Sequence, residues 1–245
     1  VELMTAGAPP PASVLQGIEK LGFNVTQVYG LTETYGHTVM STWNSDWDTL
    51  NDEQRSALKA RQGAAMVQTA GMRIVDMESR QDVPADGKSI GEILIRGNTV
   101  MKGYLKDAEN TEASLKNGWF HTGDLAVMHP QGYAEIKDRL KDIIISGGEN
   151  ISSVEIEGVL HKHEAVSLAA VVALPDEKWG EVPCAFIELL DGAAVTEKEI
   201  EVFCRAHLAG FKRPKKVVFG ELPKTATGKI QKYELRSLAR SGRLN

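Results

Sequence analysis

The sequence predicts a mixed fold, with the end of an α/β sheet first, a small antiparallel β-barrel next and a compact α+β domain last. Three observations indicate this order. The chain opens on a strand–turn–helix–strand pattern, which is typical of α/β sheets. From about residue 66, short strands are separated by Asp-Gly, Asn-Gly and Gln-Gly turns. After residue 142, strands and helices alternate over about 100 residues, a usual size for one domain.

Each expected element rests on hydrophobic spacing and on the residues that begin or end it. Pro11 suits the first turn of a helix, and Asn51 or Asp52 is the expected N-cap of an exposed one. In the first segment we expect strands over 2–8 and 23–29 and helices over 12–21 and 51–61. In the barrel we expect strands over 72–77, 91–97 and 133–136 and a helix over 107–116. In the last domain we expect strands over 143–146, 167–174, 183–190 and 216–220 and helices over 153–161, 196–208 and 231–240.

Composition and charge exclude several classes of protein. The 28 Lys and Arg against 33 Asp and Glu give a net charge of −5, which argues against general binding of nucleic acid or anionic membranes. The longest nearly apolar run, Ala165–Leu174, is far shorter than the roughly 20 residues that span a bilayer. Cys184 and Cys204 lack metal-site spacing and lie in core-like runs, as expected of a reduced, cytoplasmic protein.

The segment Val28–Thr34 places polar side chains directly after a strand. Gly30 lets the backbone turn close to a ligand, and the hydroxyl of Thr32 follows. Glu33 offers the hard oxygen ligand that Mg²⁺ takes when it bridges phosphates. The alternative is an ordinary strand-to-turn segment with polar surface residues.

The segment Gly118–Leu125 combines two aromatic residues with a Gly-Asp step. Asp124 offers two acceptor oxygens that suit the two hydroxyls of a ribose, as the acid of a dinucleotide-binding fingerprint does. The alternative is an Asp turn beside core aromatics. His121 is expected to have a structural role in either case.

A glycine pair follows the apolar strand in Ile143–Ile151. Gly147 and Gly148 allow positive φ and the close approach of a ligand to the backbone. The alternative is a strand-to-helix turn, with Ser152 or Ser153 as the N-cap of the next helix.

Lys229 stands directly after a glycine in a polar loop, Leu222–Ile230, before the last expected helix. A lysine there can close over a phosphate or a carboxylate and neutralise its charge, whereas the alternative is a solvated side chain. The only basic run, Lys212–Lys216, is interpreted as solvated, with a landing site for a polyanionic small molecule as the alternative.

Singly these segments are weak signals, but their order and spacing resemble the adenylate-forming superfamily of acyl-CoA synthetases, luciferases and peptide-synthetase adenylation domains. The resemblance covers essentially the whole chain and rests on Ala6–Ala8, Tyr29–Thr34, Gly91–Ile93, Gly118–Leu125, Asp138–Ile151 and Pro223–Lys232. Within the superfamily, the chain is similar to bacterial medium- or long-chain fatty-acyl-CoA synthetases and methylmercaptopropionate–CoA ligases. This similarity rests on Trp43, Trp47 and the segment Lys59–Gly63.

The resemblance implies a role for each matching residue in the activation of a carboxylic acid by ATP, with magnesium and coenzyme A. Thr32, Glu33 and Lys229 would be catalytic, with Mg²⁺ on Glu33 and Lys229 between the substrate carboxylate and the α-phosphate. Tyr29 would stack on adenine. ATP or AMP would contact Gly7, Ala8, Tyr29, Gly30, Thr32, Asp124, Arg139 and Lys229, with the ribose on Asp124 and Arg139. Coenzyme A would pass along Ser146, Gly147, Gly148 and Glu149.

The resemblance also implies a division into domains. Residues 1–65 would be the C-terminal portion of a nucleotide-binding α/β subdomain, and residues 66–138 a β-barrel subdomain. Residues 139–142 would be a hinge at Lys141, and residues 143–245 a mobile α+β domain. The family's phosphate loop would lie upstream of Ala6, so we expect the C-terminal part of a longer enzyme that is inactive by itself.

The sequence thus predicts an ATP-dependent acid–CoA ligase, a fatty-acyl-CoA synthetase, that works through an acyl-adenylate. One alternative is an adenylation domain that loads a carrier protein. The other is a non-catalytic nucleotide- or CoA-binding module. The pattern leaves the activated acid and the oligomeric state open.

Overall fold

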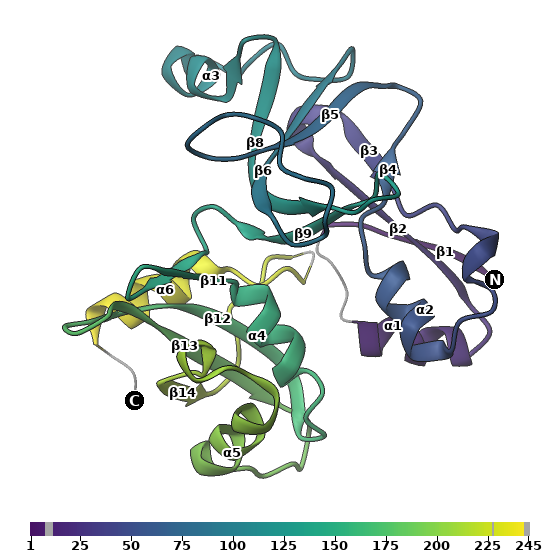
Figure 1. The fold of residues 1–245 in the computed structure, drawn as a ribbon. Coiled ribbons are helices and arrows are strands. Elements are labelled where there is room, and N and C mark those ends of the chain that lie inside the picture. The colour runs from purple at the N-terminus through teal and green to yellow at the C-terminus, as the bar shows by residue number, and fades with distance from the viewer. Residues whose placement is uncertain (8–11, 227, 243–245) are drawn as a thin grey trace. The chain divides into compact units, whose positions relative to one another are not determined.

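The computed structural model describes residues 1–7, 12–226 and 228–242, and the chain divides into two compact units, Val1–Leu140 and Lys141–Asn245 (Figure 1). The predicted mixture of α/β and α+β structure is confirmed. The border between the units falls inside the stretch 139–142, but the role of this stretch as a hinge stays a prediction.

The first unit begins with a four-stranded sheet in the order β1-β2-β3-β4. β1 and β2 are parallel, with Thr5 opposite Gln27, and the other neighbours are antiparallel. Helices α1 and α2 lie side by side (Figure 1), and Asn51 is the N-cap of α2, as predicted. The elements are β1 (Glu2–Thr5), α1 (Ala12–Lys20), β2 (Asn24–Leu31), the 3-10 turns η1 (Thr32–Thr34) and η2 (Ser45–Trp47), β3 (Gly36–Met40), α2 (Asp52–Lys59) and β4 (Ala64–Ala65).

A close approach between β2 and β3 requires glycine at position 30. A Cβ atom on Gly30 would lie 2.0 Å from the carbonyl oxygen of Gly36, and a backbone atom cannot yield cheaply. We therefore expect Gly30→Ala to lower the free energy of unfolding by about 1–3 kcal/mol in urea denaturation. Gly17→Ala is the matched control, because a Cβ on Gly17 in α1 meets nothing within 4 Å. Equal effects of the two substitutions would contradict the steric argument.

The second sheet of the first unit is antiparallel, in the order β5-β6-β8, and both β7 and β9 pair with β8. Its core includes Ile74, Ile93, Ile95 and Ala126, all buried. The sequence analysis did not identify β8 as one continuous strand, because a bulge interrupts its alternation at Thr122–Asp124. The elements are β5 (Thr69–Val75), β6 (Ile90–Gly97), α3 (Ala108–Ser114), β7 (Leu115–Lys116), β8 (Trp119–Met128) and β9 (Ala134–Arg139).

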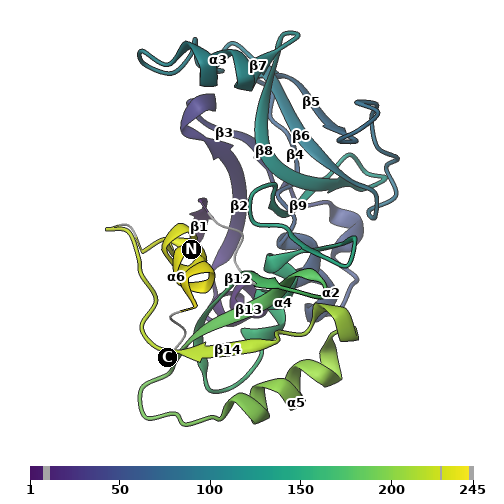
Figure 2. The ribbon, with the colours of Figure 1, turned by 90° about the vertical axis from the view of Figure 1, so that its left-hand side faces the viewer.

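The second unit is a five-stranded sheet in the order β11-β10-β13-β12, with β14 parallel to β13. Side chains of β12 alternate between two cores. Ala169 and Val171 pack with α4 and α5, whereas Ala170 and Val172 pack with α6, so helices cover both faces (Figure 2). The elements are β10 (Ile144–Ser146), β11 (Glu149–Ile151), α4 (Ser153–Leu160), β12 (Val166–Asp176), β13 (Gly180–Leu189), α5 (Glu197–His207), the 3-10 turn η3 (Gly210–Lys212), β14 (Lys216–Phe219) and α6 (Lys232–Ser241).

The glycine pair of the second unit closes a β-hairpin. Gly147 and Gly148 have φ values of 59° and 89°, and Ser146 stands opposite Glu149 in the register of β10 and β11. A two-residue hairpin loop needs positive φ at both positions, which glycine supplies. The interpretation as a strand-to-helix turn is therefore wrong, although Ser152 is the N-cap of the following helix α4, as predicted.

Both cysteines lie in the core, as their apolar neighbours in the sequence predicted. Cys184 and Cys204 are buried free thiols, and burial raises the pKa of Cys184 to about 12 and that of Cys204 to about 11. Thiols with such pKa values are poor nucleophiles at neutral pH. Within the described ranges, no helix combines the length and apolar character that crossing a membrane requires.

Candidate functional site

Three of the predicted nucleotide-binding residues meet in the first unit, on β2, β8 and β9. The hydroxyl of Tyr29 donates a hydrogen bond of 2.7 Å to Oδ2 of Asp124. Nε of Arg139 lies 3.3 Å from Oδ1 of the same carboxylate, because Arg139 stands opposite Asp124 in the register of β8 and β9. We call these three residues the Tyr29–Asp124–Arg139 cluster.

The carboxylate of Asp124 is buried at the centre of this cluster, with 5% of the residue exposed. Burial, then the negative charge of Asp124 and its hydrogen bond, hold the pKa of Tyr29 well above its ordinary value. Tyr29 is therefore a neutral donor at physiological pH. Because each carboxylate oxygen carries two lone pairs, Asp124 can also accept hydrogen bonds from a ligand's hydroxyl groups.

Asp124 lies at two irregularities in the strand pairing of β8, one with β6 and one with β9. On one side, Glu92 pairs with Leu125 and Leu94 pairs with His121, so β8 has two more residues than β6 between these pairs. On the other side, the register of β8 and β9 shifts between Leu125 and Ala126. Bulges of this kind redirect side chains and are frequent next to functional sites.

The turn after β2 presents Thr32 and Glu33. The buried side chain of Thr34 holds this turn, since its Oγ1 accepts from the backbone N–H of Leu31 at 3.0 Å and lies 2.8 Å from the carbonyl oxygen of Gly36. Thr32 is exposed and Glu33 is partly exposed. Both side chains are thus carried on a rigid turn that remains open to a ligand.

Tyr104 orients the carboxylate of Glu33, a contact that the sequence analysis did not identify. Its hydroxyl donates to Oε1 of Glu33 at 2.9 Å, and the backbone N–H of Met101 donates to the carbonyl oxygen of Glu33 at 2.7 Å. Burial, then the hydrogen bond to Glu33, raise the pKa of Tyr104. Tyr104 is 71 positions from Glu33, so no local pattern could have revealed it.

The other predicted adenine contacts lie at the end of β1. Gly7 follows β1, which runs parallel to β2, and has a φ of 94°. Carboxyl ends of parallel strands meet at one edge of a sheet, where α/β proteins bind ligands. Ala8 lies outside the described residues.

Glu33 is suited to hold magnesium as one ligand among several. The described residues contain no group of three or more His, Cys, Asp or Glu that could bind a metal ion by themselves. Mg²⁺ is commonly bound by one or two carboxylates together with substrate phosphates and water. A partly exposed carboxylate, oriented by a neutral phenol, fits this requirement.

In the second unit, the backbone of Lys229 pairs with Thr225. The N–H of Thr225 donates to the carbonyl oxygen of Lys229 at 2.8 Å, and the N–H of Lys229 donates to Oγ1 of Thr225 at 3.1 Å. Lys224 and Ile230 form a β-bridge beside the loop. The residue Lys229 is exposed, and its backbone is bonded to Thr225.

The predicted coenzyme A residues form the β10–β11 hairpin, and Trp179 supports it. The N–H of Gly147 donates to the carbonyl oxygen of Trp179 at 2.8 Å. A Cβ atom on Gly147 would lie 2.8 Å from the Trp179 ring, so the close contact depends on glycine. Ser146 is buried, whereas Gly147, Gly148 and Glu149 are exposed. The hairpin thus presents its turn to solvent on a fixed support.

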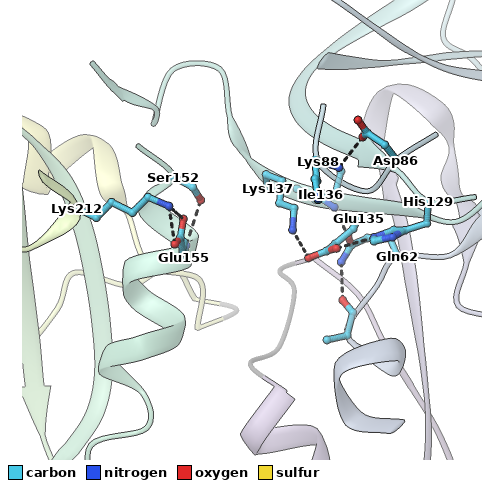
Figure 3. Close-up of polar contacts among 11 residues, drawn as sticks. Gln62, Asp86, Lys88, His129, Glu135, Ile136, Lys137, Ser152, Glu155 and Lys212 are labelled. Carbon is cyan, nitrogen blue, oxygen red and sulfur yellow. Dashed lines mark hydrogen bonds and ion pairs between the residues drawn. The ribbon is translucent and has the colours of Figure 1, made fainter. Parts of the chain in front are cut away.

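The basic run Lys212–Lys216 is largely engaged within its own unit. Nζ of Lys212 lies 2.7 Å from the Glu155 carboxylate (Figure 3), and Nε of Arg213 donates to a backbone carbonyl. Nζ of Lys216 lies 3.3 Å from Glu197. These contacts agree with the interpretation as a surface charge run rather than an anion site.

The two units have the fold of adenylate-forming enzymes. A family model described as "AMP-binding enzyme" matches residues 1–105, and one described as "AMP-binding enzyme C-terminal domain" matches residues 155–229. The chain belongs to this AMP-binding enzyme family.

Named relatives agree with this assignment. An acetate–CoA ligase of Humulus lupulus is 52% identical over 245 residues, which cover 98% of this chain and 43% of the relative. A peroxisomal acetate/butyrate–CoA ligase of Arabidopsis thaliana is 51% identical over 245 residues, with coverage of 98% and 43%. The o-succinylbenzoate CoA synthetase of Bacillus subtilis, solved with its acyl-adenylate intermediate, has a TM-score of 0.79 at 33% identity and coverage of 96% and 46%. The chain spans less than half the length of these relatives.

Proposed function

We propose that the chain is part of an ATP-dependent acid–CoA ligase that works through an acyl-adenylate. The Tyr29–Asp124–Arg139 cluster carries the proposal. It holds a carboxylate between Tyr29 of β2 and Arg139 of β9, with the cation of Arg139 at 3.3 Å to offset part of its charge. Such a carboxylate suits the paired hydroxyls of a ribose. The acid–CoA ligases among the named relatives support the same activity.

Each predicted nucleotide-binding residue of the first unit would have its own part in nucleotide binding. The hydrogen bond from the Tyr29 hydroxyl to Asp124 fixes the orientation of the Tyr29 ring, which would stack on adenine. Gly7, Ala8 and Gly30 would contact the nucleotide. Arg139 would contact the ribose beside Asp124, and the Thr32 hydroxyl would donate to a phosphate oxygen.

Adenylation joins the acid to the α-phosphate and releases pyrophosphate. A carboxylate oxygen attacks the α-phosphorus, and negative charge accumulates between two anions. Lys229 would neutralise this charge by lying between the carboxylate and the α-phosphate. Glu33 would hold Mg²⁺, which would supply further charge stabilisation at the phosphates.

Thioester formation requires a different arrangement at the same centre. The thiolate of coenzyme A attacks the acyl carbonyl carbon, and AMP leaves with the bonding electrons. We propose that residues 143–245 rotate about Lys141 between the two steps, so that the Ser146–Glu149 hairpin replaces Lys229 near the adenylate. Two rigid units joined by a short hinge suit two successive reactions at one site.

The activated acid is proposed to be a fatty acid or a related small carboxylic acid. The candidate substrates are medium- or long-chain acids and methylmercaptopropionate, together with acetate and butyrate, for which the relatives are named. Tyr35 and His37 would shorten or polarise the acyl pocket, since both are exposed just after the η1 turn. ATP–pyrophosphate exchange with a series of acids of increasing chain length tests both the activity and the substrate.

The cytoplasmic location of the protein also remains a proposal, because one named relative is peroxisomal.

Asp124→Ala should weaken AMP binding by about tenfold or more in the natural protein that contains residues 1–245, because hydrogen bonds to a charged group are lost. Isothermal titration calorimetry with AMP measures the effect. Asp82→Ala is the control, since Asp82 is an exposed acid that pairs with Arg73 on the same sheet. Unchanged AMP affinity in Asp124→Ala would reject the proposed ribose site, and no pyrophosphate exchange with any acid would reject the proposed activity.

A further inference from the structure

Glu92 is a buried carboxylate that the proposed reaction does not use. Only 5% of the residue is exposed, and it lies on β6 beside the bulge that carries Asp124. Its Oε1 accepts a hydrogen bond of 3.1 Å from the backbone N–H of Gly123, and its Oε2 lies 2.9 Å from Nδ1 of His121. Arg80 contributes a longer contact of 3.4 Å to Oε2.

Glu92 thus bonds to Gly123, the residue directly before Asp124, whose carboxylate is the proposed ribose site. We propose that Glu92 is a positioning residue, which holds the Thr122–Gly123–Asp124 bulge so that Asp124 faces the nucleotide. The inference rests on the proposed function, because it assigns to Glu92 an effect on nucleotide affinity.

The bulge creates the need for a side-chain acceptor at this position. Extra residues in a bulge lose their partners in the strand ladder, and buried N–H groups without an acceptor are costly. The Gly123 N–H bonds to the Glu92 carboxylate instead of a β6 carbonyl. An apolar residue at position 92 would fill the core but leave this N–H unsatisfied.

Thr122 completes the support from the other end of the bulge. Its hydroxyl donates to the carbonyl oxygen of Ile93 at 2.8 Å and accepts from the N–H of Asp124 at 3.1 Å. The backbone on both sides of residue 123 is therefore tied to β6, through Glu92 and through Ile93. Gly123, a glycine with a φ of 68°, supplies little steric restraint of its own, so these bonds, together with the bond from the Leu140 N–H to the Gly123 carbonyl oxygen, hold the backbone that carries the Asp124 side chain.

A second histidine–glutamate pair in the same sheet provides a matched control. Nε2 of His129 lies 2.8 Å from Oε2 of Glu135 on β9, and Lys137 also contacts Glu135 (Figure 3). Among the residues that the structure describes, Glu135 bonds to His129 and Lys137 and not to the Asp124 bulge. Loss of Glu135 should therefore affect stability without affecting the nucleotide.

The test measures the dissociation constant of AMP and the ATP dependence of pyrophosphate exchange in the natural protein that contains residues 1–245. Glu92→Ala should weaken AMP binding by about tenfold, the scale of one lost hydrogen bond to a charged group. It should raise the KM for ATP more than it lowers kcat, because the loss lies in nucleotide positioning. Glu135→Ala should leave AMP binding within about twofold of wild type, whatever its effect on thermal stability.

Two conservative variants distinguish positioning from a structural role. Glu92→Gln keeps an oxygen for the Gly123 N–H and an amide for His121, so AMP affinity should stay within about twofold of wild type. Glu92→Asp keeps the charge but withdraws the oxygens by one methylene, so it should resemble Glu92→Ala. If Glu92→Ala does not fold, Glu92→Asp is measured in its place.

A double-mutant cycle shows whether Glu92 acts through Asp124. Once Asp124 is replaced by alanine, Glu92→Ala should cause no further loss of AMP affinity. The proposal is overturned if Glu92→Ala and Glu92→Asp leave AMP affinity unchanged, if Glu135→Ala weakens AMP equally, or if Glu92→Ala has its full effect without Asp124. An Asp124→Ala variant with wild-type affinity would instead reject the proposed ribose site, and this proposal with it.

Discussion

Lys229→Ala should lower adenylation by about 10²–10³-fold and leave the conversion of supplied acyl-adenylate to acyl-CoA nearly unchanged. The first effect is the usual scale for removal of one preorganised electrostatic group. Thioester formation has no such requirement, because the adenylate is already activated and the proposed rotation moves Lys229 away. Both half-reactions are measured on one preparation of the natural protein that contains residues 1–245.

The position of Lys229 makes this experiment informative. Because Lys229 is exposed, its replacement should change the free energy of unfolding by no more than about 0.5 kcal/mol. Lys162→Ala, which removes an exposed lysine from the same unit, controls for the change in net charge. Adenylation at the wild-type rate, or equal loss in both steps, would show that Lys229 does not have this role.

Local patterns predicted most elements of the second unit, because its longer strands are nearly apolar runs bounded by turn residues. The expected strand 167–174 lies inside β12, and the expected helix 196–208 nearly coincides with α5. By contrast, β3 was not expected, since Thr38 and Val39 are adjacent and both buried next to a register shift in β2. Such irregularities remove the alternation on which a strand prediction depends.

The site was predictable as a set of residues but not as a geometry. Asp124 was named from its own segment, and Tyr29 and Arg139 were named from the family resemblance, whereas their contact depends on strand registers between distant parts of the chain. Tyr104 was not named from the sequence, and Glu92 was named only within the segment Gly91–Ile93 and without a role, because their roles arise from pairing across 71 and 31 positions. Long-range hydrogen bonds leave no local signature in a single sequence.

The hinge assignment can be tested at one residue, because both neighbours of Lys141 are tied down. The N–H of Leu140 donates to the carbonyl oxygen of Gly123 at 2.8 Å, within the first unit. The carboxylate of Asp142 is buried and forms an ion pair with Arg236 on α6, within the second unit. A rotation between the units must therefore be concentrated in the backbone torsions around Lys141.

Lys141→Pro should allow one half-reaction and impair the other by about 10²-fold or more, the cost of misplacing reacting groups by about 1 Å. Proline fixes φ near −65° and also restricts Leu140, so only one of two hinge conformations can remain accessible. Lys141→Ala is the control and should keep the two rates in their wild-type ratio, because alanine leaves φ free. Equal loss of both steps in Lys141→Pro would indicate misfolding, and no loss would remove the hinge from Lys141. Since Leu140 and Asp142 are anchored in different units, no other residue between them could take its place.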